Sequence, residues 1–444
     1  MTPASEHRAT FRAARVPEAG TVHRLVSSAK TAWLPVTLAF WPWSPAVVNY
    51  VLAKRGLIGQ VGLVQGFLLA PASYWPLLLL LLAKSQRNVL VAALRHPRLL
   101  FYVAFPHAAA VVAGALLASS DPYRSLVWFA GIAIGAYAAL CVSTALGQHG
   151  LMMWLRWTAA VGAVVVGLMI CTGGEITGAG RLHAGFLATS LAFMMFPVAV
   201  VSLFSRWHVG IPIAGAAVYV MALTRARGGI GAAAVGAAVA LGVSRRYWLL
   251  LTLLLGLALL SLVYGPDTLL AQSASALELN DPRRGFEGGA TGRVVRWEAG
   301  LGLFYESPVI GHGFQQVQWT HNGWISLLAE VGLLGTAPLV YFYGRAVWAY
   351  ARKPGAQLTP LALGLLAGHL FMSMFEGYVI NVGGPPSLIA LTLALHGFSL
   401  HRPPAAPPQE ALAAHSVDVT VAQPPAVPVR AGAPHPAEGE HLVP

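Results

Sequence analysis

The sequence predicts an all-α membrane protein, a chain that crosses the lipid bilayer as about twelve helices. Hydrophobic residues make up 56% of the 444 residues and charged residues only 10%, whereas soluble domains are about 25% charged. The mean hydropathy is +0.64. Apolar runs of roughly 20 residues, the length that a helix needs to cross a membrane, recur from about residue 33 to residue 400. A soluble globular enzyme is therefore excluded.

Reading these runs in order, we expect spans near residues 33–53, 57–83, 99–119, 125–146, 150–172, 184–205, 207–223, 228–243, 247–265, 333–351, 358–375 and 384–400. Prolines interrupt the first two spans, at Pro42, Pro45, Pro71 and Pro76. One long loop, about residues 266–320, separates the ninth span from the tenth.

The chain divides into three parts by composition. Residues 1–30 are basic and have no apolar core, so we expect a cytoplasmic tail and not a signal peptide. Residues 31–400 form the transmembrane domain. Residues 401–444 are rich in Pro and Ala and cannot bury a core, which predicts a disordered cytoplasmic tail. The net charge of +12 is scattered over short loops, which favours membrane lipids and phosphates as partners and not nucleic acid.

The excess of Lys and Arg predicts the orientation, because cytoplasmic loops of membrane proteins carry more of them. With both termini inside, 18 of the 28 lie on the cytoplasmic side. The others face outward: Lys54, Arg55, Arg124, Arg181, Arg225, Arg227, Arg283, Arg284, Arg293 and Arg296. Positive charge on the outer side is not required by topology, so these residues are candidates for a binding site.

The long loop carries two of the outward arginine pairs. Its aromatic residues predict ordered, partly helical structure, and residues 292–306 have helical spacing. Arg293 and Arg296 are three positions apart and so share a helix face beside Trp297. A solvated loop explains Arg283 and Arg284 equally well.

Arg225 and Arg227 lie at the outer junction of the seventh and eighth spans. A guanidinium near membrane depth snorkels to lipid headgroups or faces a polar site. Because its planar fork suits bidentate binding of phosphate, we interpret the pair as a phosphate clamp. Lys54 and Arg55 are equally explained as acceptor-phosphate contacts or as interfacial anchors.

His321 is the candidate general base, because histidine takes up protons near neutral pH and this one opens an amphipathic segment at the water interface. Glu330 is nine residues further on, on the opposite face of a straight helix, and is interpreted as a supporting residue. Glu376, at the outer end of the eleventh span, is expected to orient a histidine or to pair with an arginine. His312 is a rival base, although two flanking glycines indicate a turn.

We expect neither a metal nor a cofactor. The only aspartates are Asp121, Asp267, Asp281 and Asp418, so no Asp-x-Asp pair is present to hold a divalent cation on a diphosphate. No phosphate-binding Gly-x-x-x-x-Gly-Lys loop is present either. Arginines would have to neutralise a diphosphate substrate.

Several motifs resemble those of the O-antigen ligase and polymerase superfamily. They are Arg227-Gly228 before a span, Gly292-Arg293 through Trp297 leading to Ser307-Pro308 and Gly311-His312-Gly313, and His321-Asn322-Gly323 running to Glu330-Val331-Gly332-Leu333-Leu334-Gly335. The motifs cover about residues 220–340. Ala226 stands where the family pattern has serine, which leaves open whether Arg225 or Arg227 fills the family's arginine role.

The resemblance implies glycosyl transfer at the periplasmic face of a bacterial inner membrane. A ligase would move O-antigen from undecaprenyl diphosphate to a sugar hydroxyl of lipid A-core, completing lipopolysaccharide. It implies His321 as the base, Arg225, Arg227, Arg293 and Arg296 on the diphosphate, and supporting roles for Asn322, Trp297, Glu330 and Glu376. The alternatives are an O-antigen polymerase, a protein O-oligosaccharyltransferase and, from another class, a non-catalytic lipid or polysaccharide transporter. The nearly charge-free midspans favour an interfacial enzyme over a transporter.

Overall fold

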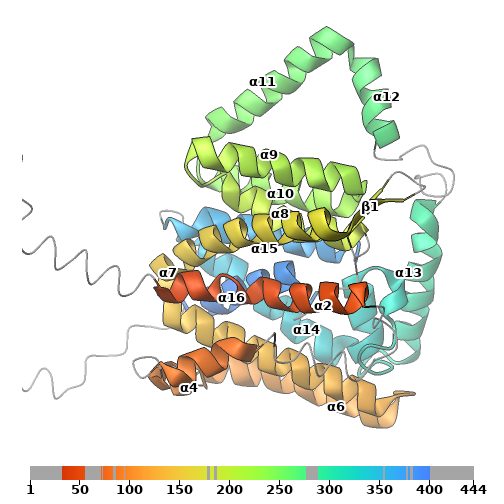
Figure 1. Cartoon of the computed structure of the whole chain (residues 1–444). Coiled ribbons are helices and arrows are strands. Elements are labelled where there is room, and N and C mark those ends of the chain that lie inside the picture. The colour runs from red at the N-terminus through yellow and green to blue at the C-terminus, as the bar shows by residue number, and fades with distance from the viewer. Residues whose placement is uncertain are drawn as a thin grey trace, which may run out of the picture. The chain divides into compact units, whose positions relative to one another are not determined.

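The computed structural model describes residues 33–55, 72, 74–83, 87–94, 96–177, 181–184, 188–276, 289–353, 356–376, 379–380 and 384–400. These residues are mostly helical, which confirms the general fold class (Figure 1). The first half contains helical residues 33–38, η1 (Trp41–Trp43), α2 (Ser44–Lys54), helical residues 74–82, α4 (Arg87–Leu94), α5 (Pro97–Leu99), the π-helical η3 (Leu100–Ala104), α6 (Phe105–Leu117) and α7 (Pro122–Gly173).

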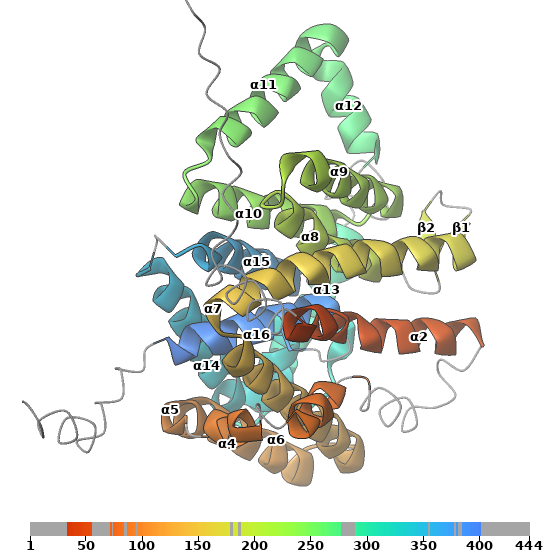
Figure 2. The same ribbon diagram turned by 60° about the vertical axis from the view of Figure 1, so that its left-hand side comes forward.

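The second half begins with a β-hairpin. Its elements are β1 (Gly174–Ile176), β2 (Leu182–Ala184), α8 (Ala188–Ser202), α9 (Trp207–Thr224), α10 (Arg227–Val243), α11 (Tyr247–Tyr264), α12 (Pro266–Ala276), α13 (Gly289–Glu306), η4 (Gln318–Thr320), α14 (Gly323–Ala351), α15 (Leu358–Ser373) and α16 (Pro385–Ser399). Figure 2 shows α11 and α12 standing apart from the other helices.

Four described segments are long and apolar enough to cross a membrane: Pro97–Leu117, Pro122–Gly173, Trp207–Thr224 and Gly323–Ala351. Shorter apolar helices lie at Thr189–Ser202, Arg227–Val243 and Leu358–Ser373. The protein is therefore a helical membrane protein, while the count of about twelve spans stays a prediction. The two predicted spans within α7 are continuous in the chain but separated at Gly147, whose φ of 56° and ψ of −171° are not helical.

The structure departs from the expected spans where the sequence holds prolines. Pro42 and Pro45 lie in the first turns of η1 and α2, so the first expected span is divided into short helices. A proline is favoured in the first helical turn, where its missing N–H is not needed. Residues 56–71, which hold most of the second expected span, lie outside the described residues, as do Arg283, Arg284 and both expected tails.

The expectation of a purely all-α fold is wrong in one respect. The antiparallel strands β1 and β2 pair after α7, with Gly174 opposite Ala184 and Ile176 opposite Leu182. Strands of three residues are too short to display the alternating pattern that predicts a strand from sequence. The short helix α4 was not expected either.

Two helices that matter for the site, α10 and α15, pack through small residues. Ala232, Gly236 and Ala240 of α10 face Gly364 and Gly368 of α15, each set spaced by four residues. A Cβ at Gly364 would lie 2.5 Å from the carbonyl oxygen of Gly236. Small residues at this spacing let membrane helices approach closely.

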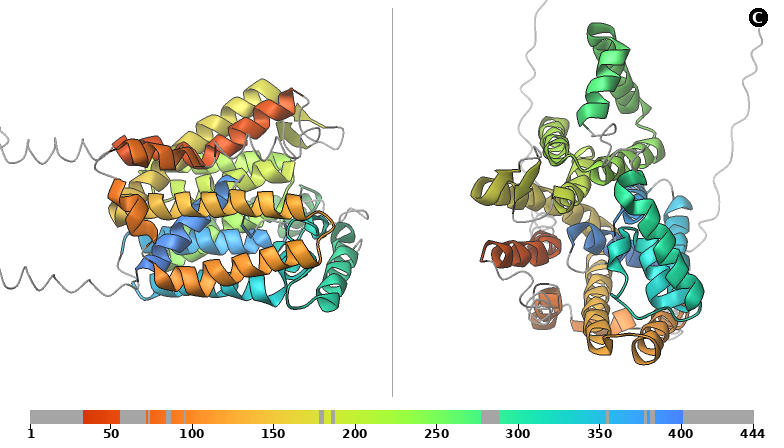
Figure 3. Two further views of the ribbon diagram at one scale, coloured as in Figure 1. Left: turned by 90° about the horizontal axis from the view of Figure 1, so that it is seen from below. Right: turned by 90° about the vertical axis from the view of Figure 1, so that its right-hand side faces the viewer.

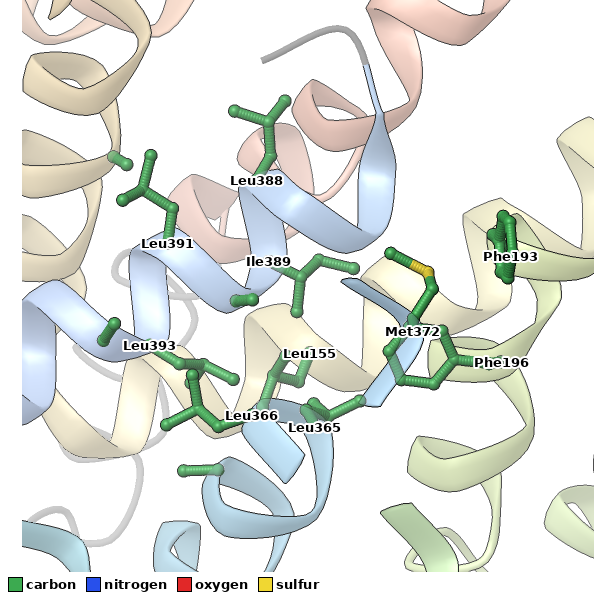
Figure 4. Packing of buried hydrophobic residues seen from close by; sticks show 14 of the residues in the cluster. Leu155, Phe193, Phe196, Leu365, Leu366, Met372, Leu388, Ile389, Leu391 and Leu393 are labelled. Carbon is green, nitrogen blue, oxygen red and sulfur yellow. The ribbon is translucent and has the colours of Figure 1, made fainter. Parts of the chain in front are cut away.

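This packing is antiparallel, so the beginning of α10 meets the end of α15. Gly228 lies against Phe375, while Gly236 lies against Gly364 further along. The apolar core continues beside α15, where side chains of α7, α8, α15 and α16 interdigitate (Figure 4). Arg227 and Glu376 are thereby held at the same end of the helix pair.

The helix α13 lies across one end of the helical bundle (Figure 3). Ends of several helices gather there. Helix α13, which carries Arg293 and Arg296, lies at this end together with β1 (Figure 1). We call this end the basic end. The other predicted outward basic residues that the structure describes stand at or next to the ends of helices or strands: Lys54, Arg55, Arg124, Arg181, Arg225 and Arg227.

Candidate active site

The candidate base lies in a tight turn between η4 and α14. His321 has a φ of 53°, in the left-handed region that few non-glycine residues adopt. Asn322 follows as the N-cap of α14, and its Oδ1 accepts hydrogen bonds from the N–H groups of Trp324 (3.0 Å) and Ile325 (3.1 Å). The Thr320 hydroxyl lies 2.5 Å from that of Ser326 and closes the turn.

Gly323 explains why a glycine follows Asn322 in this turn. A Cβ at this position would lie 3.0 Å from the carbonyl oxygen of Glu376 and 2.9 Å from Cγ2 of Val379. These two residues belong to the segment after α15. The absence of a side chain at Gly323 thus allows the His321 turn to lie directly against the segment that carries Glu376.

The expected helix over residues 292–306 is present as α13, which presents one face to this turn. Gly300 lies against Thr320 and Ile325, where a Cβ would be 2.7 Å from a methyl carbon of Thr320. Arg293 and Trp297, four positions apart, lie on nearly the same face as Gly300. The indole nitrogen of Trp297 is buried and has no hydrogen-bond partner.

Glu376 lies between Arg293 and His321. Its Oε1 is 3.5 Å from a guanidinium nitrogen of Arg293, and its Oε2 is 3.9 Å from Nδ1 of His321. Both distances allow ionic attraction but are longer than good hydrogen bonds. The side chain of Glu376 is 11% exposed, that of Arg293 25% and that of His321 43%. The carboxylate is thus enclosed, while the histidine remains open to a ligand.

The surroundings shift the proton affinities of both groups. Partial burial, followed by the charges of Arg293 and Arg296, lowers the pKa of His321 below its usual value of 6.5. Burial raises the pKa of Glu376 to about 7, against the opposing effect of Arg293. His321 is therefore mainly neutral at pH 7, the form that accepts a proton.

Arg225 and Arg227 flank the junction of α9 and α10, also at the basic end. Arg225 ends α9 in the left-handed conformation, with a φ of 51°, and Arg227 is the first residue of α10. Ala226 between them is the N-cap of α10 and makes no side-chain capping bond. The next residue, Gly228, lies against Phe375, beside Glu376. The residue that follows Arg227 in the chain therefore contacts the segment that carries Glu376.

Glu330 occupies a different position, inside α14. It is 1% exposed, and its Oε1 accepts a hydrogen bond from the N–H of Val317 at 2.9 Å. Ser326 donates to the carbonyl oxygen of Val317 at 2.9 Å. Glu330 thereby supports the segment that leads into the His321 turn. A small cavity beside it is lined by His107, Gln315, Gln318 and Ser326, which sequence reasoning missed.

The glycine-rich motifs explain an interruption in α14 and the backbone hydrogen bonds that compensate for it. Gly332 interrupts the helix with a φ of 59° and a ψ of −165°. The backbone groups released there bond to the segment 308–313: the N–H of His312 donates to Ala329 O (2.8 Å), and the N–H of Leu333 donates to Pro308 O (2.8 Å). A Cβ at Gly332 would lie 2.3 Å from Val309, so only glycine fits here.

The rival base His312 contacts the end of α13. Its Nε2 lies 2.8 Å from the carbonyl oxygen of Leu303 and 3.8 Å from Glu306, at the end of α13. Lys54 lies against Gly173 at the end of α7. Neither residue is part of the group around Glu376. Within the described ranges, no three His, Cys, Asp or Glu side chains gather as a metal site requires.

The sequence predicted the contact between Glu376 and His321 only in part. Glu376 stood out as an acid near membrane depth, and either a histidine or an arginine was expected as its partner. The structure places it within 4 Å of one of each. The 55 positions that separate it from His321 carry no periodic signal that pairs them.

The fold and this site define a class: a helical membrane protein in which a histidine and an arginine share one carboxylate at the basic end. Residues 212–340 match the Wzy_C family model, which is described as O-Antigen ligase. The match confirms the resemblance to the O-antigen ligase and polymerase superfamily over these residues, which make up less than half of the chain. No curated protein matches the sequence. The matched residues include His321 and all four candidate arginines, whereas Glu376 lies beyond them.

Proposed function

We propose that the protein is an O-antigen ligase of the bacterial inner membrane. It transfers O-antigen from undecaprenyl diphosphate to a sugar hydroxyl of lipid A-core at the periplasmic face. One observation carries the proposal: a half-exposed His321 and Arg293 lie within 4 Å of different oxygens of the same carboxylate, that of Glu376. A proton acceptor and an anion binder are thus within reach of one bound glycosyl diphosphate.

In the proposed reaction, His321 takes the proton of the acceptor hydroxyl. Its Nδ1 faces Glu376, so a hydrogen on Nδ1 leaves the Nε2 lone pair for the hydroxyl. The hydroxyl oxygen forms a bond to the anomeric carbon of the donor sugar. The bond from that carbon to the diphosphate oxygen breaks with its electron pair, and attack from the opposite face inverts the anomeric configuration.

The arginines bind the diphosphate and stabilise the charge that develops on it as it leaves. Arg293 and Arg296 act from α13, and Arg225 and Arg227 act from the α9–α10 junction. The proposal needs neither a metal nor a cofactor, because guanidinium groups supply the positive charge. Trp297, Asn322, Glu330 and Glu376 support the site from their positions around the His321 turn.

The orientation is part of the proposal. The basic end faces the periplasm and both termini face the cytoplasm, because most Lys and Arg outside the candidate site then lie inside. An acceptor that is completed outside the cytoplasm and a lipid-linked donor both reach such a site from the membrane surface.

Glycan transfer by the purified protein tests the proposal. The protein is incubated with undecaprenyl-diphosphate-linked glycan and lipid A-core, with chelator and without ATP, and products are separated on gels. His321→Ala removes the proposed base. His312→Ala is the matched control, because this histidine bonds to Leu303 O and lies outside the Glu376 group.

A ligase gives glycosylated lipid A-core in the wild type and in His312→Ala but not in His321→Ala. Longer undecaprenyl-linked chains would identify a polymerase, and a glycosylated protein acceptor an oligosaccharyltransferase. No turnover of any donor, with flux of the intact lipid-linked glycan across reconstituted vesicles, would identify a transporter. Each of the last three results contradicts the ligase proposal.

A further inference from the structure

Glu376 is one carboxylate with two cationic or proton-binding neighbours on different elements. Arg293 comes from α13, and His321 comes from the turn before α14. Each neighbour faces a different oxygen of Glu376, Oε1 for Arg293 and Oε2 for His321. Because both distances exceed a hydrogen bond, Glu376 is fully engaged with neither group.

The two contacts compete through charge. When it is ionised, the carboxylate of Glu376 carries one negative charge, and a neighbouring guanidinium neutralises most of its attraction for a second cation. While Arg293 holds Glu376, an imidazolium at His321 gains little from the carboxylate and is also repelled by the cations of α13. These cations and the burial of the ring lower the pKa of His321, so it is a weak base in this state.

A diphosphate would change this balance. Arg293 is 25% exposed on its side chain, so a ligand can reach it. A diphosphate carries more than one negative charge and offers several oxygens to a planar guanidinium, and it therefore competes well with a single carboxylate. Arg293 would turn to the ligand and leave Glu376 with His321 as its remaining partner.

We propose that donor binding switches Glu376 from Arg293 to His321 and thereby activates the base only when the glycosyl diphosphate is in place. This inference rests on the proposed function and specifies how that site is regulated. Glu376 is a positioning residue in this scheme, since it acts through His321 and does not touch the reacting atoms.

The proton balance of the reaction follows directly. The acceptor hydroxyl gives its proton to Nε2 of His321, the new bond forms from its oxygen to the anomeric carbon, and the diphosphate leaves with the electron pair. The imidazolium that forms is stabilised by the carboxylate of Glu376 against Nδ1. Without the donor, the charges of Arg293 and Arg296 oppose protonation of His321. The ring therefore does not take up a proton before the glycosyl diphosphate is bound.

The other charged groups around the pair are few among the described residues. Arg293 and Arg296 face His321 from α13. Arg227 begins α10, whose Gly228 lies against Phe375 beside Glu376. Glu330 is turned toward Val317. Glu376 is therefore the carboxylate placed to act on His321.

The first test compares two pH profiles. The value of kcat/KM for the donor reports the free enzyme, and kcat/KM for the acceptor at saturating donor reports the donor complex. We expect the acidic limb of the second profile to lie at higher pH, by about one unit. In Glu376→Gln the difference in pH between the two acidic limbs should fall to less than half of the wild-type difference. An equal separation in Glu376→Gln, or none in the wild type, would overturn the switch.

The second test separates binding from catalysis. Glu376→Gln frees Arg293, so undecaprenyl diphosphate without a glycan should bind at least as tightly as to the wild type, while kcat for transfer falls about tenfold or more. A purely structural role would weaken both. Glu306→Gln is the matched control, because this acid lies 3.8 Å from His312 and outside the site. Weaker binding in Glu376→Gln would contradict the proposal.

A second variant keeps the proposal testable should Glu376→Gln not fold. Arg293→Gln leaves Glu376 to His321 permanently, so the acidic limb of the free enzyme should rise to the position of the wild-type donor complex. If the acidic limb of free Arg293→Gln lay at the same pH as that of the free wild-type enzyme, the proposed switch would be refuted. The failure of the proposed function looks different: wild-type protein would bind no undecaprenyl diphosphate or would transfer no glycan to lipid A-core.

Discussion

A Cβ on Gly364 would lie 2.5 Å from the carbonyl oxygen of Gly236, so α10 and α15 touch backbone to backbone. The contact has a functional consequence at the far end of both helices. It fixes the distance between the beginning of α10, where Arg227 lies, and the segment after α15 that contains Glu376. The geometry of the basic end thus depends on small residues deep in the helix pair.

Gly364→Val is therefore expected to destabilise the protein by about 1–3 kcal/mol, the cost of overpacking a close interface. Thermal unfolding in detergent measures this change. Gly242→Ala in α10 is the matched control, because a Cβ there meets nothing within 4 Å; it should leave stability unchanged or slightly raise it. Equal melting temperatures for Gly364→Val and the wild type would contradict the close packing.

Asn322→Ala should cost about 0.5–2 kcal/mol, because it removes the cap from the two N–H groups at the start of α14. Asn322→Asp keeps the accepting oxygen and should retain most of the stability. Chemical or thermal unfolding of the three proteins provides the comparison. If the Asp variant were as unstable as the Ala variant, the capping role assigned to Asn322 would be wrong.

Ala226→Ser should stabilise the beginning of α10 by about 1 kcal/mol. Ala226 is the N-cap and supplies no side-chain acceptor, whereas a serine hydroxyl would accept from the N–H of Gly228 or Gly229. The expected result is a higher melting temperature with transfer activity retained. A lower melting temperature would indicate that the buried hydroxyl finds no partner.

The pH dependence of transfer should respond to Arg296. Because the pKa of His321 is lowered, its neutral form persists below pH 6.5, and kcat/KM for the donor should retain more than half its maximum at that pH. Arg296→Gln removes one cause of the lowering, so the pKa rises and the acidic limb moves to higher pH. Arg98→Gln, at the start of the Pro97–Leu117 span, is the control. A limb at the same pH in Arg296→Gln would contradict this electrostatic account.

Local patterns determined much of this protein. The length and spacing of apolar runs predicted most of the described helices, including the division near residue 147. Helical spacing within the long loop predicted the helix over residues 292–306. The motifs around Arg227, Arg293 and His321 predicted a resemblance to the O-antigen ligase superfamily, and the family-model match over residues 212–340 confirms that resemblance. These features are visible in one dimension because helical periodicity and turn chemistry depend on near neighbours in the chain.

The remaining features were decided by packing between distant segments. The pairing of Glu376 with both Arg293 and His321 requires the contact of Gly323 with the Glu376 segment. The contact of His312 with Leu303 O requires the hydrogen bonds between residues 308–313 and the interruption of α14 at Gly332. Such contacts depend on how helix faces approach one another in three dimensions. A carboxylate interacts with the charges that lie within a few ångströms of it, and these charges belong to residues distant in the sequence. The sequence by itself determined which groups this membrane protein possesses, and the tertiary structure decided which of them meet.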